Sequence, residues 1–537
     1  MCARSGARST ACNARRPGGA SIRFDGPEPS PSSPRPPMRQ RRSGVLLHPT
    51  SLPGPGAAGT LGQEAIRWLD RLSEAGQRVW QILPLGPADT GGSPYMARSA
   101  FGGNPALISP SWLVDRGWLA AEHQADACDP RWRTVSDPDV ACQQGLRCAW
   151  LAWDHVRARR PDVVQAFMQW RGEQASWLED QALFEALRSR YQQRLWLDWP
   201  VDIRSRESSA LVSARRELSE EVDRQAFAQF AFDRQWANVR RAAGERGVRI
   251  LGDIPIYVSL QSADVWQHPT LFDLGPDLHP RAVAGVPPDY FSTQGQRWGN
   301  PLYRWERMAE DDHAWWCRRF SRVLEHCDEV RLDHFRGFES FWEVPATSEF
   351  AVDGQWVQGP GRALFDSLQR TLGSLPVLAE DLGTITPAVD ALRRECGFPG
   401  MAILQFAFGG SPANPYLPHN LEPHQTVYTG THDNDTTLGW YATAAAEARD
   451  HVRRYLSTDG HDISSRLLKT AWLSVCETAI APVQDVLGLG TERRMNTPGT
   501  QSGNWTFRLS EHEWTDDTSE WVHGLTSLAG RLPDAPE

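Results

Sequence analysis

Lysine is almost absent from this sequence of 537 residues, because Lys469 is the only lysine among the 56 lysine and arginine residues. P-loop kinases, pyridoxal enzymes and Schiff-base aldolases each need a lysine in a particular context. Lys469 lies in the segment RLLKTAW, whose pattern predicts a helix. These three classes of enzyme are therefore nearly eliminated.

Other features are missing as well. No apolar run reaches about 18 residues and no charged start precedes an apolar stretch, so nothing predicts a membrane span or a secretory signal. The nine cysteines include no C-x-x-C pair, which gives no sign of a disulfide framework or a zinc site. The net charge is −10 without a basic stripe, which argues against nucleic-acid binding. We expect a cytoplasmic protein with a neutral or polar substrate, no cofactor and no obligate protein partner.

The first 37 residues differ in composition from the rest, with six arginines, two acids and the run PEPSPSSPRPP. Such a stretch cannot pack a core and is expected to be disordered. Its arginine and serine content resembles a transit peptide, and a start codon placed too early, with Met38 as the true start, is an alternative of equal weight. Residues 38–537 are expected to form one decorated catalytic domain.

Short apolar segments that end in Gly, Pro, His or Asp recur from Gly44 onward. They are GVLLHPTSLPG, RVWQILPLGP, VRILGDIPIYV, EVRLDHFRG, PVLAEDLG, MAILQFAF, TVYTGTHD and VCETAIAPVQDVLG. Helix-like stretches such as AIRWLDRLSEAG follow most of them, and this alternation indicates a parallel sheet covered on both faces. About eight such units predict a (β/α)8 barrel.

The remaining length falls into two predicted insertions. The first, at about 105–245, is Trp-rich and helical in its second half. The second, at about 262–325, is rich in Gly, Pro and aromatic residues, as a loop that covers a substrate would be. We therefore expect one barrel with inserted, largely helical subdomains rather than two independent domains.

Three of the predicted strand ends carry an acid: Asp333, Glu380 and Asp433. Catalytic groups of such barrels sit where the strands end, and the spacing places the three acids after strands four, five and seven. Separated carboxylates on one rim suit glycosidic bond chemistry, although the same acids could bind Mg²⁺ or Mn²⁺. Arg331 and Arg336 argue against a metal ion, because they put positive charge beside Asp333 and keep it ionised.

Aromatic residues lie in polar, Gly-rich segments around these acids. Their flanking residues favour exposure over a place in the core, and exposed rings stack against the apolar faces of sugars. The residues concerned are Tyr95, Tyr290, Phe291, Trp298 and Trp505.

Taken together, the segments form an ordered series that runs from about Gly44 to Arg508. It comprises LLHPTSLPGPG, SAFGGNP, GDIPIYV, PPDYFSTQGQRWGNPLY, RLDHFRGFESFWEVP, AEDLG, TGTHDNDTT and DVLGLGTERRMNTPGTQSGNW. The series resembles the amylomaltase family, the bacterial 4-α-glucanotransferases of glycoside hydrolase family 77, which are relatives of the α-amylases. The resemblance implies a barrel with inserted subdomains and no separate C-terminal β-sandwich.

The resemblance also implies roles for individual residues. Asp333 would be the nucleophile, Glu380 the general acid/base, Asp433 the transition-state stabiliser, and Arg331 would orient Asp333. Other side chains would hold the hydroxyls of the donor sugar, stack against its ring and cover the acceptor side. These substrate-binding residues are Tyr95, Asp253, Asp289, Gln296, Trp298, Arg331, His432 and Asn504. Met96 departs from the family, which usually has Gln after this Tyr.

The implied activity is transfer of α-1,4-glucan segments from a maltooligosaccharide to glucose or another glucan by retaining double displacement. For this, burial and neighbouring acids should raise the pKa of Glu380, while Arg331 should keep the pKa of Asp333 low. Two alternatives are an α-amylase-type hydrolase and a non-catalytic glucan-binding protein. A metal-dependent barrel lyase is a third.

Overall fold

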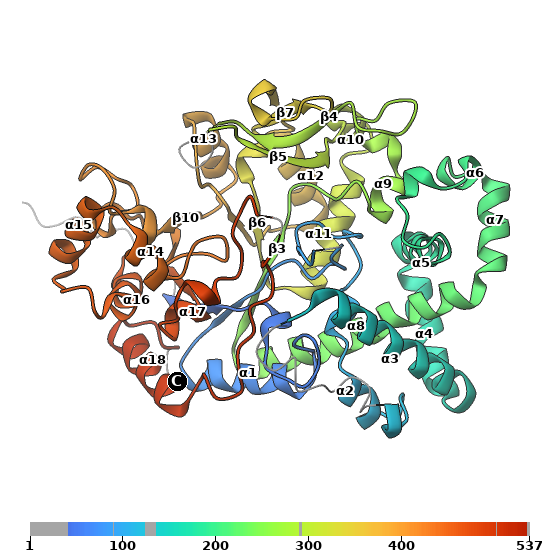
Figure 1. Ribbon diagram of the computed structural model, residues 1–537, viewed down its shortest axis with the longest axis horizontal. Coiled ribbons are helices and arrows are strands. Elements are labelled where there is room, and N and C mark those ends of the chain that lie inside the picture. Colours follow the sequence, from blue (N-terminus) through green and yellow to red (C-terminus); the bar gives the residue numbers. More distant parts are fainter. Residues whose placement is uncertain (1–40, 90, 124–135, 289–292, 501, 534–537) are drawn as a thin grey trace, which may run out of the picture. The chain divides into compact units, whose positions relative to one another are not determined.

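Eight short strands form a parallel sheet at the centre of the protein (Figure 1). The computed structural model describes residues 41–89, 91–123, 136–288, 293–500 and 502–533, so the predicted extension 1–37 lies outside the described residues. The strands of this sheet are β1 (Arg42–Leu46), β2 (Val79–Gln81), β3 (Arg249–Ile254), β6 (Glu329–Leu332), β9 (Val377–Ala379), β10 (Gly400–Ile403), β11 (Gln425–Tyr428) and β12 (Thr478–Pro482).

The order of the strands in the sheet is β10-β11-β12-β1-β2-β3-β6-β9. The two outer strands approach each other as well, because the backbone N–H of Ala379 in β9 donates to the carbonyl of Pro399, just before β10, over 3.0 Å. Each of the eight predicted apolar segments contributes one of these strands. The predicted (β/α)8 barrel is confirmed.

Amphipathic helices cover the barrel. In α1 (Gln63–Glu74) the buried residues Ala65, Trp68, Leu69 and Leu72 follow the spacing of one helical face. The other helices between and after the barrel strands are α9 (Ala263–Gln267), α10 (Trp305–Ala309), α11 (Ala314–His326), α12 (Arg362–Leu372), α13 (Pro387–Glu395), α14 (Thr437–Thr443), α15 (Ala446–Leu456), α16 (Ile463–Leu473), α17 (Val483–Val486) and α18 (Asp516–Leu528). Among the described residues after β12 there is no strand, and hence no β-sandwich.

Between β2 and β3 the chain forms a helical subdomain, which lies to the right of the barrel in Figure 1. Its interior is built from aromatic rings, with Phe227 and Phe230 of the last helix packed against Trp118, Trp153 and Phe167. Its helices are α2 (Pro110–Asp115), α3 (Pro138–Arg159), α4 (Pro161–Glu173), α5 (Ala175–Arg190), α6 (Val201–Arg204), α7 (Ser208–Glu217) and α8 (Ser219–Glu245).

A second, antiparallel sheet differs from the largely helical character expected of the insertions. Its strands are β4 (Ala282–Val286), β5 (Gln296–Pro301), β7 (Ser340–Pro345) and β8 (Gln355–Gln358), in the order β5-β4-β7-β8. Two of them precede barrel strand β6 and two follow it, so the sheet joins the second insertion to the segment after β6. It lies at the top of Figure 1.

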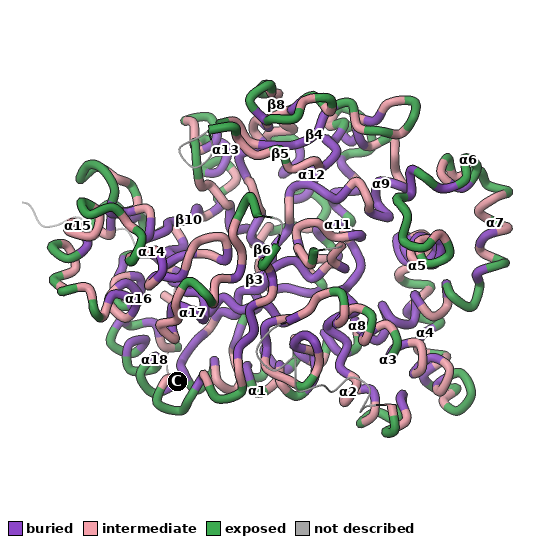
Figure 2. The backbone as a smooth tube through the Cα atoms, in the orientation of Figure 1, coloured by how far each residue is buried: buried purple, intermediate pink, exposed green. Residues whose placement is uncertain are grey.

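The barrel strands are buried over most of their length, as the purple centre of Figure 2 shows. All five residues of β12 are buried, for example. Across the part of the chain that the structure describes, no helix is long and apolar enough to cross a membrane.

Candidate active site

The three predicted acids lie after parallel strands of the barrel. Asp333 directly follows β6, Glu380 directly follows β9, and Asp433 lies in the loop after β11. These are the fourth, fifth and seventh barrel strands, as the spacing predicted. Because the carboxyl ends of parallel strands share one end of the barrel, the acids face the same rim.

Arg331, near the end of β6, joins two carboxylates. Its guanidinium is 2.7 Å from Oδ2 of Asp253 and 2.8 Å from Oδ1 of Asp333. Asp253 comes from the neighbouring strand β3, and its Oδ2 also accepts a hydrogen bond of 2.8 Å from the Tyr95 hydroxyl. The structure thus brings together four of the residues singled out in the sequence.

Burial dominates the electrostatics of this network. It raises the pKa of Asp253 to about 7, against the effect of Arg331. Burial also raises the pKa of Asp333, with Arg331 again acting in the opposite direction. The expectation that Arg331 would hold the pKa of Asp333 low is therefore wrong, because removal from water outweighs the ion pair. The guanidinium still stabilises the ionised form of Asp333.

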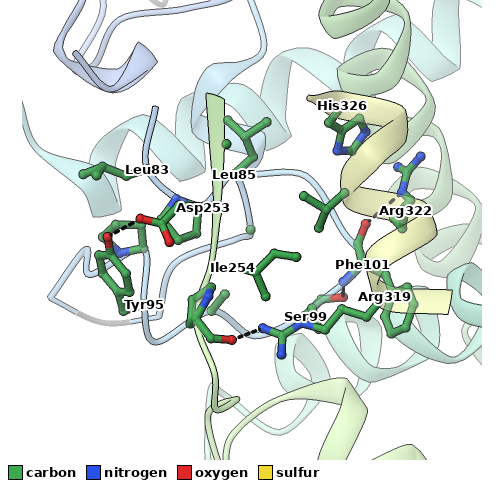
Figure 3. A pocket seen from close by; sticks show the side chains of 18 of the residues that line it. Leu83, Leu85, Tyr95, Ser99, Phe101, Asp253, Ile254, Arg319, Arg322 and His326 are labelled. Carbon is green, nitrogen blue, oxygen red and sulfur yellow. Dashed lines mark hydrogen bonds between the residues drawn. The ribbon is translucent and has the colours of Figure 1, made fainter. Parts of the chain in front are cut away.

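A pocket adjoins the network, and Figure 3 looks into it. The hydrogen bond from Tyr95 to Asp253 lies at one end, Arg322 and His326 of α11 lie at the other, and Ile254 lies between them. The second carboxylate oxygen of Asp253, Oδ1, is buried without a hydrogen-bond partner among the described residues. A buried, unpaired carboxylate oxygen is costly in a folded protein unless a ligand satisfies it.

Glu380 is held by backbone amides instead of a cation. His334 N–H donates to its Oε2 over 2.8 Å and Leu382 N–H donates to its Oε1 over 2.9 Å. Burial raises the pKa of Glu380 to about 7, and the charge of Asp333 adds to the increase, while Arg331 and the two amides oppose it. The prediction of a raised pKa for Glu380 is confirmed.

Asp433 is held by partners of a third kind. Its Oδ2 lies 3.3 Å from Nε2 of His432, and its Oδ1 accepts a hydrogen bond of 2.6 Å from Asn496. Arg494 donates to its backbone carbonyl over 2.6 Å. Asn496 and Arg494 lie in the segment DVLGLGTERRMNTPGTQSGNW, but the sequence alone does not predict them as site residues. The signal that could have found them is the presence of polar side chains in a segment following the last barrel strand.

Aromatic rings line two sides of the rim. Tyr95 stacks on His432 with ring centres 5.3 Å apart, and Trp505 lies 6.0 Å from Tyr95. Trp505 is only 7 % exposed, in contrast to the exposure expected of it. On the other side Trp298 of β5 contacts His334 edge-to-face at 4.9 Å and donates to Gln296 over 3.2 Å.

One predicted substrate-binding residue, Asn504, has its hydrogen bonds within its own loop. Asn504 accepts a hydrogen bond from the backbone of Thr497 and donates to that of Thr500, so its side chain closes its own loop. Asp289 lies outside the described residues, together with Tyr290 and Phe291. Met96, the departure from the family, accepts a hydrogen bond at its sulfur from Asn300 of β5.

Within the described ranges, no group of three or more His, Cys, Asp or Glu side chains is placed to hold a metal ion. What the rim does carry is two partly buried carboxyls directly after adjacent strands, one paired with a cation and one with a pKa near neutrality, and a third carboxylate beyond them. This fold and this set of acids define a barrel enzyme that acts on glycosidic bonds.

Comparison with known proteins identifies the family. The pattern of the 4-alpha-glucanotransferases, glycoside hydrolase family 77, matches residues 47–513. The 4-alpha-glucanotransferase of Thermus thermophilus is 46 % identical over 508 residues, covering 92 % of this chain and 99 % of that protein. The chloroplastic/amyloplastic 4-alpha-glucanotransferase of Solanum tuberosum is 44 % identical, covering 93 % and 88 %.

A solved structure agrees with these relatives. Amylomaltase from Streptococcus agalactiae, in complex with acarbose, superimposes with a TM-score of 0.89 at 34 % identity and covers 92 % of this chain and 100 % of its own. The chain belongs to the 4-alpha-glucanotransferase family, and it is a transferase that acts on α-1,4-glucans.

Proposed function

We propose that Asp333, Glu380 and Asp433 carry out this transfer by retaining double displacement. Asp333 attacks the anomeric carbon of an α-1,4-linked glucan while Glu380 protonates the departing 4-oxygen, which gives a β-linked glucosyl-enzyme. Glu380, now ionised, takes the proton from the 4-hydroxyl of the incoming acceptor, and an α-1,4 bond forms again. Asp433 stabilises the positive charge that develops on the sugar ring.

The observation that carries this assignment is the difference in surroundings between the two partly buried carboxyls, Asp333 and Glu380. Asp333 has an arginine at 2.8 Å, which favours the ionised form that a nucleophile needs. Glu380 accepts hydrogen bonds from two backbone amides, and burial raises its pKa to about 7 against the effect of Arg331, so a large fraction of it is protonated at neutral pH. A general acid and a nucleophile are distinguished by their environments in this way.

The donor sugar is proposed to lie over the network of Asp253, Tyr95 and His432. The unpaired Oδ1 of Asp253 supports this, because a sugar hydroxyl would satisfy it. Tyr95 and His432 stack on each other, so they offer one joint surface rather than two separate platforms.

The acceptor is proposed to lie on the side of β5, where Gln296 and Trp298 line the rim. A covering segment here would exclude water and raise the effective concentration of a bound glucose or maltooligosaccharide. Transfer would then exceed hydrolysis. Asp289 is proposed to contact the acceptor on the basis of the sequence alone. Asn504 is not included among the proposed substrate-binding residues. The cytoplasmic location likewise stays a prediction from the sequence.

Incubation with maltotriose alone tests the proposed function. We expect glucose together with a ladder of longer oligomers, at a constant number of reducing ends, because each transfer breaks one glycosidic bond and makes another. The purified full chain is followed by chromatography of the products and by a reducing-end assay on the same samples. Rising reducing ends without longer products would contradict the proposal and would favour the hydrolase.

A further inference from the structure

The residue that follows the proposed nucleophile has an unusual backbone. His334 lies in the left-handed region, with φ 50° and ψ 51°, which only a few per cent of residues other than glycine adopt. Strained backbone of this kind is often retained at sites where it orients a functional group.

The consequence of this conformation is visible in three successive amides. Asp333 N–H donates to the carbonyl of Ile254, on the neighbouring strand, over 3.0 Å. The next two donate to Glu380: His334 N–H to the carboxylate at 2.8 Å and Phe335 N–H to the backbone carbonyl at 3.0 Å. The left-handed turn therefore directs two N–H groups at one residue, the proposed acid/base.

The His334 side chain is enclosed by its neighbours. Trp298 of β5 contacts the imidazole edge-to-face, with ring centres 4.9 Å apart. On another side the ring lies against Gly337, where a Cβ atom would come within 2.9 Å of His334 Cδ2. The Nε2 atom is buried with no hydrogen-bond partner among the described residues, and burial lowers the pKa of His334 to about 3, so the ring is neutral.

We propose that His334 is a positioning residue for Glu380, and that Trp298 and Gly337 hold its backbone in the left-handed turn. Trp298 lies on the strand that borders the acceptor side, so this contact links the acceptor side of the rim to the group that protonates and deprotonates the 4-oxygen. The inference rests on the proposed role of Glu380.

The pH profile of the transfer reaction reports on this link. The groups that face Glu380 are Arg331 from β6, Asp333 directly after β6, and Tyr416 from the segment after β10. An N–H that donates to a carboxylate favours its ionised form and lowers its pKa. Loss of the His334 amide contact should therefore raise the pKa of Glu380 and move the alkaline limb of kcat/KM to higher pH.

His334→Val and His334→Asn form a matched pair. Valine is β-branched and avoids the left-handed region, whereas asparagine adopts it readily, and both remove the imidazole. We expect His334→Val to move the alkaline limb upward by roughly half to one pH unit and to lower kcat on maltotriose about tenfold or more. The limb of His334→Asn should stay within about 0.3 unit of the parent enzyme. Equal limbs in both variants and the parent would overturn the proposal.

Two further variants test what holds the turn, should His334→Val fail to fold. Trp298→Ala should also move the alkaline limb of kcat/KM to higher pH, whereas Trp356→Ala should leave that limb unchanged. Trp356 belongs to the same small sheet, on edge strand β8, and is 41 % exposed. A Trp298 variant with reduced affinity but an unmoved limb would overturn the proposed link between β5 and Glu380.

A donor that needs no acid separates this inference from the proposal on which it rests. Fluoride is a leaving group that needs no proton, so in the first turnover Glu380→Gln should release fluoride from α-maltotriosyl fluoride far faster than it cleaves maltotriose. If Glu380→Gln slows the first turnover of both donors equally, the role of Glu380 is wrong. If Glu380→Gln selectively slows the reaction with maltotriose, and the alkaline limb of His334→Val is the same as that of the parent enzyme, only the role of His334 is wrong.

Discussion

The two ends of the barrel use buried arginines in opposite ways. At the carboxyl ends of the strands, Arg331 holds Asp253 and Asp333 in a network in which one carboxylate oxygen is unpaired and burial raises the pKa of both acids. At the amino ends, Arg531 is fully buried and donates to the carbonyls of Trp472, Arg42 and Cys476, among others.

Ion pairs tie the amino ends of the strands together as well. Glu329, the first residue of β6, accepts hydrogen bonds of 2.5 Å from both terminal nitrogens of Arg42, the first residue of β1. Arg249, the first residue of β3, lies 2.8 Å from the same carboxylate. Satisfied polar groups stabilise one end of the barrel, and incompletely satisfied ones are available for chemistry at the other. The following changes test that division.

Asp333→Asn should have the largest effect on activity. Without a nucleophile the transfer rate should fall by a factor on the order of a thousand or more, while the midpoint of thermal unfolding stays within a few degrees of the parent. Initial rates on maltotriose and thermal unfolding curves measure the two quantities. Residual activity within tenfold of the parent would remove Asp333 from its proposed role.

The pH dependence should come next in size. Burial raises the pKa of Glu380 to about 7, so the acid is protonated below this pH and ionises above it. We expect kcat/KM on maltotriose to fall by about tenfold for each pH unit above the limb. The rate of the parent enzyme with α-maltotriosyl fluoride is the control, because its first step needs no acid. An alkaline limb of equal slope with both donors would contradict the assignment.

Asn496→Ala should have a smaller effect at the same end of the barrel. It removes the 2.6 Å hydrogen bond to Asp433 and should lower kcat roughly tenfold, since a hydrogen bond to a charged group contributes about 1.5 kcal/mol. Asn504→Ala is the matched control, because its amide closes the loop between Thr497 and Thr500. If Asn504→Ala lost as much kcat as Asn496→Ala, Asn504 would have to return to the site.

Arg531→Met should have the smallest effect on activity and a clear one on stability. The loss of donors to several buried carbonyls should lower the midpoint of thermal unfolding by several degrees, with kcat changed less than about twofold. Arg241→Met, at an exposed arginine paired with Glu245, serves as the control for removal of a surface charge. A large fall in kcat with an unchanged midpoint would show that the two ends are not divided as described.

Much of the barrel could be predicted because its strands are continuous apolar segments followed by amphipathic helices. Asp333 and Glu380 could be found for the same reason, since each directly follows such a segment. The small sheet was not foreseen, because β4, β5, β7 and β8 are short and come from both sides of β6. Their pairing depends on tertiary contacts that no local pattern reports.

The polar groups that hold the acids were harder to predict. Asn496 and Arg494 reach Asp433 from a loop about 60 residues further along the chain, and loop residues have no periodicity that reveals a contact. Asn504 was assigned from the resemblance, yet its hydrogen bonds are local. The direction of the pKa shift of Asp333 also required the structure, because the degree of burial decides it.

The central claim is that two partly buried acids of one rim, Asp333 and Glu380, have different roles. The identity of the covalently modified carboxyl tests this claim most directly. Glu380→Gln is mixed with α-maltotriosyl fluoride without an added acceptor, quenched, digested and analysed by mass spectrometry. We predict a maltotriosyl-enzyme that accumulates on the peptide containing Asp333, because the first step needs no acid and the second lacks its base. An adduct on Asp433 or on Asp253 would contradict the account. Fluoride release without any detectable adduct would contradict it as well.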